Sequence, residues 1–169
     1  MTEARDAAHW DAVEEAAELL QEGRFADALP VLGDVIKQDP NNPYAYHHLG
    51  VAFFELGQRE AARDAYRAAV RLAPDFLGSR VALSHVLRML GDVNGALAEA
   101  EEALRRFPKD GEAMHAAGLA NAAKGNRPTA RRQLAGFLET NPQFEASQEV
   151  RQILEMLGIG DDDEPIEFD

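Results

Sequence analysis

Cysteine is absent from the 169-residue sequence, so disulfides and thiolate metal sites are excluded. Basic residues are outnumbered, with 17 Lys and Arg against 30 Asp and Glu and a formal net charge of -13 at pH 7. The average field of such a chain repels polyanions, which argues against nucleic acid and anionic membranes as partners. Neither a secretion signal at the N-terminus nor an apolar run of roughly 18 residues is present. We therefore expect a cytoplasmic protein with no membrane insertion.

Recognisable catalytic motifs are also lacking. The sequence contains no phosphate-binding glycine loop, no zinc-protease helix motif and no nucleophile elbow. The glycines that recur in it have roles in turns or in helix packing, as described next. We therefore predict that the protein is not an enzyme, and we assign it no catalytic residue, cofactor or metal.

The sequence does contain an internal repeat with a period of 34 residues. Glycines, prolines and alanines each recur at this interval: Gly23, Gly57, Gly91 and Gly125; Pro40, Pro74, Pro108 and Pro142; Ala28, Ala62, Ala96 and Ala130. Glycine can close a helix in the left-handed conformation, and proline cannot continue a helix. The segments between these residues have helical rather than alternating periodicity. Each period therefore predicts a helical hairpin, and the whole chain an all-α fold.

Small residues mark the points where the two helices of a hairpin should cross closely. They are Ala16, Gly50, Ser84 and Gly118, and they should face the alanine set of the second helices. Glycine inside a helix costs about 1 kcal/mol relative to alanine. Its presence at Gly50 and Gly118 therefore predicts close contact at the backbone.

One segment resembles a complete tetratricopeptide repeat. The residues that carry the resemblance are Tyr46, Leu49, Gly50, Phe53, Gly57, Ala62, Tyr66, Ala69 and Pro74. The resemblance implies a right-handed superhelical solenoid with repeats at 9–42, 43–76, 77–110 and 111–144. The other repeats depart from the pattern at Glu15, Ser84, Ala100 and Asn121, where the family favours leucine, glycine and two aromatic residues, respectively. We expect those repeats to be packed less firmly than the second.

The remaining segments should extend or close the solenoid. Residues 1–8 form an N-terminal extension, and an apolar stripe in 145–157 predicts a capping helix. Residues 158–169 are acidic and poor in apolar surface, so we expect a disordered tail. Pro30 stands about one turn into a second helix and predicts a kink or a late helix start, whereas Pro128 falls harmlessly in a first turn.

In the tetratricopeptide family the first helices line a concave groove that commonly binds an extended or helical peptide. The positions that correspond to this groove, and that we assign as candidate peptide-binding residues, are Trp10, Val13, Ala17, Tyr44, His47, Val51, Phe54, Val81, His85, Arg88, His115 and Leu119. This lining is apolar and aromatic with interspersed histidines, and it suits a partner that presents hydrophobic side chains. The alternative is that Trp10 and Tyr44 pack together at the N-terminal end of the solenoid.

Some family members are co-chaperones that hold a C-terminal carboxylate in a clamp of lysine, arginine and asparagine. The corresponding positions here are Val13, Ala17, His48, Gly78 and Ala82. The clamp is therefore absent, and we do not expect recognition of chaperone C-termini. His47, His85 and His115 share the predicted concave side, but their spacing is not a local metal-ligand motif. We interpret them as polar groove contacts, with a metal site and simple packing as the alternatives.

The predicted function is a non-catalytic adaptor that binds a protein or peptide partner in the concave groove. Two alternatives remain: a self-assembly module that forms homo-oligomers, and a small acidic chaperone of the bacterial secretion type. The acidic tail offers a further hypothesis, because its last five residues, from Pro165 to Asp169, form an apolar and acidic segment that could enter the groove and mask it.

Overall fold

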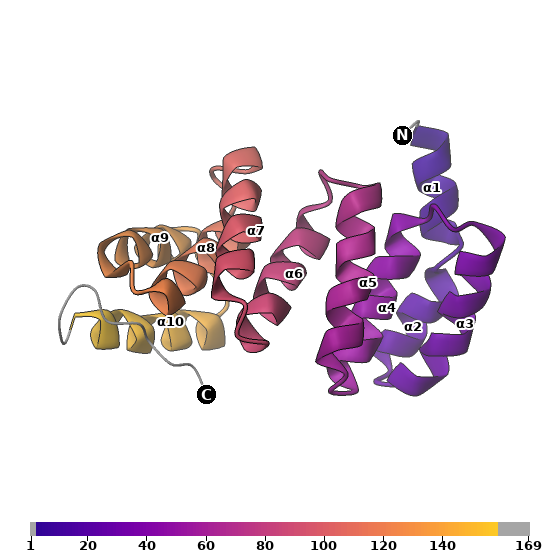
Figure 1. Ribbon diagram of the computed structural model, residues 1–169, viewed down its shortest axis with the longest axis horizontal. Helices are drawn as coiled ribbons and strands as arrows, with labels where there is room; N and C mark the ends of the chain where they lie inside the picture. Colours follow the sequence, from indigo (N-terminus) through magenta and orange to yellow (C-terminus); the bar gives the residue numbers. More distant parts are fainter. Residues whose placement is uncertain (1–2, 159–169) are drawn as a thin grey trace. The chain divides into compact units, whose positions relative to one another are not determined.

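The computed structural model describes residues 3–158, and all regular secondary structure in that range is α-helical, as predicted (Figure 1). The helices are α1 (Glu3–Asp11), α2 (Glu14–Gln21), α3 (Phe25–Gln38), α4 (Pro43–Glu55), α5 (Arg59–Leu72), α6 (Leu77–Met89), α7 (Val93–Arg106), α8 (Gly111–Lys124), α9 (Arg127–Glu139) and α10 (Phe144–Leu157). Apart from Gly158, the segment expected to form the acidic tail lies outside the described residues.

Consecutive helices pack as hairpins. Contacts join α2 to α3, α4 to α5, and α8 to α9. In the third hairpin, Ser84 Oγ of α6 donates a hydrogen bond of 2.8 Å to the carbonyl of Ala96 in α7. The chain divides into two compact units, residues 1–80 and 81–169, and each is described below by itself.

The turns within the hairpins close as the glycine set predicts. The φ angle is positive at every one of the four: +74° at Gly23, +75° at Gly57, +82° at Gly91 and +91° at Gly125. Side chains other than hydrogen rarely tolerate this conformation, so glycine is needed here. The recurrence of glycine every 34 residues is therefore explained by the backbone conformation of the turn in each hairpin.

Close contact at the backbone is confirmed at Gly118, where an added Cβ would lie 3.3 Å from the backbone nitrogen of Leu134, whereas at Gly50 the near neighbour is the ring of Tyr66. A Cβ atom at Gly50 would lie 2.6 Å from the ring of Tyr66, and one at Gly118 would lie 2.6 Å from the side chain of Leu134. Tyr66 and Leu134 each stand four residues after the alanine expected opposite. A large side chain one helical turn further along therefore fills the space that each glycine leaves.

Each unit has its own hydrophobic core. In the first unit, buried residues of α2, α3 and α4 pack together with Val13: Val13, Ala16, Ala28, Leu32, Tyr44 and Ala45. In the second unit, α10 packs against α9, and its buried residues Val150, Ile153 and Leu157 join the core. The C-terminal helix thus covers apolar side chains of the last hairpin.

The first repeat differs from the expectation. A turn at Ala12 and Val13 splits its first helix, so that α1 begins at Glu3, inside the expected N-terminal extension, and α2 begins at Glu14. Pro30 lies inside α3, which starts at Phe25, so a late helix start is wrong. Pro30 has no backbone N–H, so one intrahelical hydrogen bond of α3 is missing. Ala28 and Leu32 of the same helix are buried in the core of the first unit, and this packing holds the helix. Pro128 falls in the first turn of α9, as expected.

Asn121 occupies a position where the family favours an aromatic residue, and it builds a buried polar network instead. Its side chain is 2% exposed. Nδ2 donates to the carbonyl of Ala117 at 3.0 Å and to Gln133 Oε1 at 2.9 Å. Asn126 Nδ2 donates to Asn121 Oδ1 at 2.9 Å. Hydrogen bonds therefore join α8 to α9 at this point.

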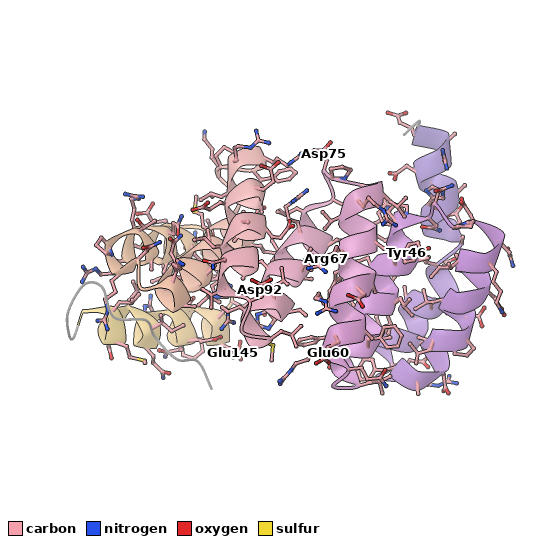
Figure 2. The ribbon with its side chains drawn as sticks, in the orientation of Figure 1. Tyr46, Glu60, Arg67, Asp75, Asp92 and Glu145 are labelled. Atoms are coloured by element: carbon pink, nitrogen blue, oxygen red, sulfur yellow. The ribbon has the colours of Figure 1, made fainter. Side chains whose placement is uncertain are left out.

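The outer surface carries charged side chains. Glu60 and Arg67 of α5, Asp92 before α7 and Glu145 of α10 are all exposed (Figure 2). Within residues 3–158, none of the helices has both the length and the apolar composition needed to cross a bilayer.

Candidate functional site

The predicted groove residues of the second repeat lie along one face of α4. Tyr44, His47, Val51 and Phe54 are separated by three, four and three residues, a spacing that places them on one side of a helix. Tyr44 is buried, and the other three are half-buried. Their alignment places an apolar and aromatic strip on α4.

The N-terminal part of this strip belongs to a cluster of rings, which we call the aromatic platform: Tyr44, His47, His48 and Phe76. The ring of Phe76 lies 5.2 Å from that of Tyr44 and 4.8 Å from that of His47, in both cases edge to face. The rings of His47 and His48 are 5.5 Å apart. Phe76 stands directly before α6, so the platform joins α4 to the turn that follows α5.

Trp10 of α1 covers the platform. Its indole stacks on Tyr44 with ring centroids 3.9 Å apart and an interplanar angle of 22°. It also meets His48 and Phe76 edge to face at 6.1 Å and 6.2 Å. Tyr44 is only 7% exposed beneath it, whereas Trp10 itself is 43% exposed. The two aromatic residues thus pack on each other at the N-terminal end, and they are not separate positions along an open groove.

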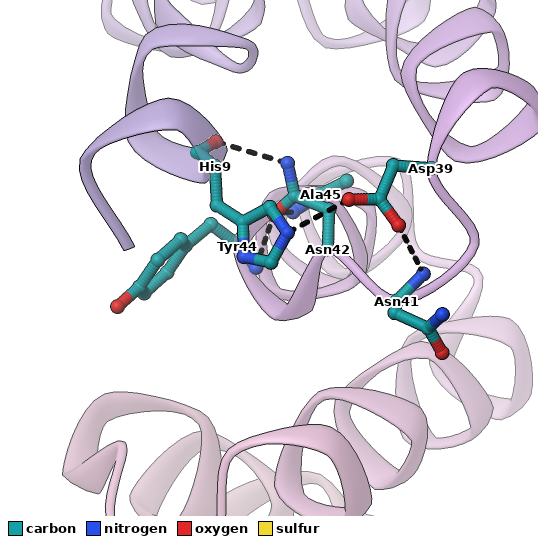
Figure 3. A network of polar contacts seen from close by, with 6 residues as sticks. All are labelled: His9, Asp39, Asn41, Asn42, Tyr44 and Ala45. Atoms are coloured by element: carbon teal, nitrogen blue, oxygen red, sulfur yellow. Dashed lines mark hydrogen bonds and ion pairs between the residues drawn. The ribbon is translucent and has the colours of Figure 1, made fainter. Parts of the chain in front are cut away.

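Asn42 ties α1 to α4 (Figure 3). As the N-cap residue of α4, it accepts hydrogen bonds through Oδ1 from the amides of Tyr44 at 3.0 Å and Ala45 at 3.2 Å. Its Nδ2 donates to the carbonyl of His9 at 2.9 Å. One fully buried side chain therefore satisfies the start of α4 and the end of α1 together.

Two further polar contacts hold α1. His9 Nε2 lies 2.8 Å from Asp39 Oδ2, and Asp39 also accepts from the amide of Asn41 at 2.9 Å (Figure 3). The hydroxyl of Tyr44 donates to Asp6 Oδ1. These bonds bridge about 30 to 40 residues of sequence, so they depend on the folded hairpin.

The environment of the platform favours the neutral forms of its titratable side chains. Burial, with the neighbouring His48 adding to it, lowers the pKa of His47 to about 4. Burial also lowers the pKa of His48. Burial and the hydrogen bond to Asp6 raise the pKa of Tyr44 to about 12. His47 Nδ1 lies 2.9 Å from Ser79 Oγ, which gives the neutral ring a polar partner.

In the second unit, Val81, His85 and Arg88 share one face of α6. His85 is exposed, whereas Val81 and Arg88 are half-buried. Arg88 Nη2 lies 3.1 Å from His85 Nδ1. Burial lowers the pKa of Arg88, and Glu149 of α10 opposes this shift.

His115 of α8 stacks on Phe137 of α9, with ring centroids 4.6 Å apart and an interplanar angle of 20°. Burial lowers its pKa; Glu149 opposes the shift and Arg88 adds to it. The charges of Arg88 in α6 and Glu149 in α10 therefore both act on His115, which is half-buried in the second unit.

Three of the predicted groove residues belong to the hydrophobic cores: Tyr44, which lies beneath Trp10, together with Val13 and Leu119. Val13 is 1% exposed and packs with α3 and α4, and Leu119 is 6% exposed and packs with α9 and α10. Each makes its contacts inside its own unit. We therefore leave Val13 and Leu119 out of the proposed binding surface.

The three histidines of the predicted concave side have different neighbours. His47 pairs with Ser79, His85 with Arg88, and His115 with Phe137. Between residues 3 and 158, no group of three or more His, Cys, Asp or Glu side chains is arranged to hold a metal ion.

Comparison with known families matches residues 19–83 and residues 81–146 to the tetratricopeptide repeat. The chain is a tetratricopeptide repeat protein. It is 29% identical to human DnaJ homolog subfamily C member 3 over 98 residues, which cover 58% of this chain and 19% of that protein. The curated relatives that it matches are much longer, and the matched regions cover between 5% and 29% of their length.

Solved structures show the same fold. A MamA double mutant superposes with a TM-score of 0.76 at 18% identity, covering 89% of this tetratricopeptide repeat protein and 83% of MamA. The first tetratricopeptide domain of Spaghetti (RPAP3), bound to the HSP90 peptide SRMEEVD, gives a TM-score of 0.63 at 19% identity and covers 68% of this chain and 91% of that domain.

Sequence reasoning did not find several residues that build the platform and its cover. Asp6, Asp39, Asn42 and Phe76 were not among the predicted site residues, and neither was Phe137 beneath His115. Asn42 had a detectable signal, because asparagine followed by proline is a typical helix start. The others depend on contacts between distant segments, which the repeat pattern does not encode.

Proposed function

We propose that this tetratricopeptide repeat protein is a non-catalytic adaptor that binds a segment of another protein along the first helices of its repeats. The observation that carries the proposal is the strip of α4, where His47, Val51 and Phe54 place aromatic and aliphatic surface in a row. Aromatic side chains at such a surface supply much of the energy of peptide recognition.

The relatives support a protein partner. Human DnaJ homolog subfamily C member 3 and a co-chaperone of Cryptococcus neoformans share sequence with this chain, and the tetratricopeptide domain of RPAP3 binds an HSP90 peptide. The clamp positions carry His48 and apolar or small residues here. We therefore propose that the segment binds through its hydrophobic side chains and not through a terminal carboxylate.

Each unit carries its own accessible members of the predicted set. In the first unit they are His47, Val51 and Phe54. In the second unit Val81, His85, Arg88 and His115 supply a more polar surface.

Affinity capture from a lysate of the source cell tests this proposal. The wild-type chain is compared with Val51→Ala/Phe54→Ala and with a matched control, Val70→Ala/Leu72→Ala, which removes half-buried aliphatic groups from α5. Circular dichroism first establishes equal helical content. Capture of a protein by wild type and control, but not by the α4 variant, supports the proposal. Equal capture by all three, or none, counts against the α4 strip.

A further inference from the structure

The N-terminal helix α1 is attached to the first unit by few contacts. Its nine residues, EARDAAHWD, include one buried side chain, His9. Its contacts with the rest of the unit include the indole of Trp10, the carboxylate of Asp6 and the two bonds of His9, and Arg5 acts electrostatically on Asp39. The helix contributes no aliphatic side chain to the buried core of this unit.

The junction between α1 and α2 is a short turn, in which the Val13 amide donates to the Trp10 carbonyl at 3.1 Å. The turn at Ala12 and Val13 separates the two helices, and α2 has no side-chain cap that binds it to α1. Val13 and Ala16 remain packed against Ala28 and Leu32 on the far side of this turn. The α2–α3 core therefore does not require α1.

The surface beneath α1 has the features of a binding site for an aromatic side chain. Tyr44, Phe76 and His48 form three sides around the indole of Trp10. The Tyr44 hydroxyl adds a hydrogen-bond donor for an acidic group one helical turn before the indole. His48 Nε2 is buried and has no hydrogen-bond partner among the described residues, so α1 leaves part of this surface unsatisfied.

We propose that α1 is an internal ligand of the aromatic platform, and that a partner helix carrying an acidic residue and, four residues later, a tryptophan replaces it. This proposal rests on the proposed function, because it names the segment chemistry that the α4 strip recognises. The partner gains over α1 by reaching His48 Nε2 with a polar side chain and by continuing toward Val51 and Phe54. Bound α1 would then keep the N-terminal end of the strip closed until such a helix arrives.

A peptide of residues 3–12, labelled with fluorescein, tests whether the platform accepts the helix from solution. It is titrated into the full chain as wild type, as Asp6→Ala/Trp10→Ala, and as the control Glu3→Ala, which removes one acidic group from the exposed side of α1. The double variant should bind at least ten-fold more tightly than the wild type and the control, because its own α1 no longer occupies the platform. A peptide with alanine at the tryptophan position should not bind it.

Equal binding to all three chains, or binding that does not need the tryptophan, overturns the proposal when the double variant keeps wild-type helical content. If that variant loses helicity, a second measurement decides. Trp10 is the only tryptophan of the chain, so its emission reports α1 directly. About 1 mM of the peptide with phenylalanine in place of tryptophan, which matches the effective concentration of a tethered helix, should shift this emission to the red. An unchanged spectrum overturns the proposal.

These outcomes are separate from the test of the proposed function. If the peptide experiments fail, α1 is not an internal ligand of the platform. A capture that depends on Val51 and Phe54 would still support the proposed function. Failure of the capture with successful peptide binding has the opposite meaning: the platform would then recognise only the chain's own helix.

Discussion

Asn42 donates a 2.9 Å hydrogen bond to the carbonyl of His9 and caps α4 with the oxygen of the same side chain. The His9 carbonyl is one of the last in α1, where helix geometry leaves carbonyls without partners inside the helix. Two helix ends separated by a whole hairpin therefore share one buried amide. The position of α1 depends on this residue as well as on the ring stack.

Substitutions at Asn42 should separate capping from tethering. Asn42→Ala loses both functions and should lower the free energy of unfolding by about 1–3 kcal/mol. Asn42→Asp keeps the capping oxygen but replaces the donor to His9 by a repelling oxygen, so it should release α1 while leaving global stability within about 1 kcal/mol of wild type. Urea unfolding followed by circular dichroism measures the first quantity, and Trp10 emission reports the second. A normal Trp10 spectrum in Asn42→Asp would contradict the tethering role.

Gly50 and Gly33 give a matched pair of glycine-to-alanine substitutions inside helices. At Gly50 the new Cβ would lie 2.6 Å from the Tyr66 ring, so Gly50→Ala should destabilise by about 1–3 kcal/mol despite its better helix propensity. At Gly33 nothing lies within 4 Å, so Gly33→Ala should stabilise by up to about 1 kcal/mol. Thermal unfolding of both variants checks the opposite signs, and equal signs would mean that close approach at Gly50 is not what selects glycine.

Pro30 should reduce the stability of α3. It is exposed within the helix and cannot donate to the carbonyl of Ala26, so Pro30→Ala should raise the free energy of unfolding by about 1–3 kcal/mol. Pro128→Ala is the control: that proline lies in the first turn of α9, where no intrahelical bond is lost, and the change should stay within about 0.5 kcal/mol. Urea denaturation compares the two, and a similar response would show that α3 already compensates for Pro30.

His47 should make stability depend on pH. Its pKa is about 4 in the folded protein, below the unfolded value of 6.5, so the unfolded chain binds more protons between these values. The contribution is complete above pH 6.5 and is lost as the pH falls toward 4, with a total size of up to about 3 kcal/mol. Urea unfolding at pH 7 and pH 5 should show a loss in wild type that His47→Gln reduces. An identical loss in both proteins would assign the effect to other groups.

The repeat could be predicted from sequence because its marker residues answer local requirements. Gly57 is needed where φ is positive, and Gly50 where Tyr66 approaches, so each residue type follows from its immediate geometry. At Pro30 the same reasoning predicts a kink or a late helix start, and the late start is wrong because α3 begins at Phe25. Local rules therefore located the hairpins but did not fix every helix start.

The candidate site was less predictable for a physical reason. Tyr44 was identified by its repeat position, and its packing with Trp10, given as an alternative, is confirmed by the ring stack, whereas the bond to Asp6, 38 residues earlier, was not foreseen. The break at Val13 has no strong sequence signal, because the residues around it favour a continuous helix. The arrangement depends on contacts between α1 and α4, and the repeat pattern of the sequence does not encode contacts between such distant segments.

The polar network of Asn121 sets a limit on the interchangeability of the hairpins. Equal length and equal turns suggest that any hairpin could be copied into the place of another, as modules are in designed arrays. A copy of the second hairpin's first helix, however, would put Phe53 where Asn121 stands and deprive Gln133 and Asn126 of their partner. The fourth hairpin is thus a matched pair of helices, and in this protein the unit of exchange is the hairpin as a whole.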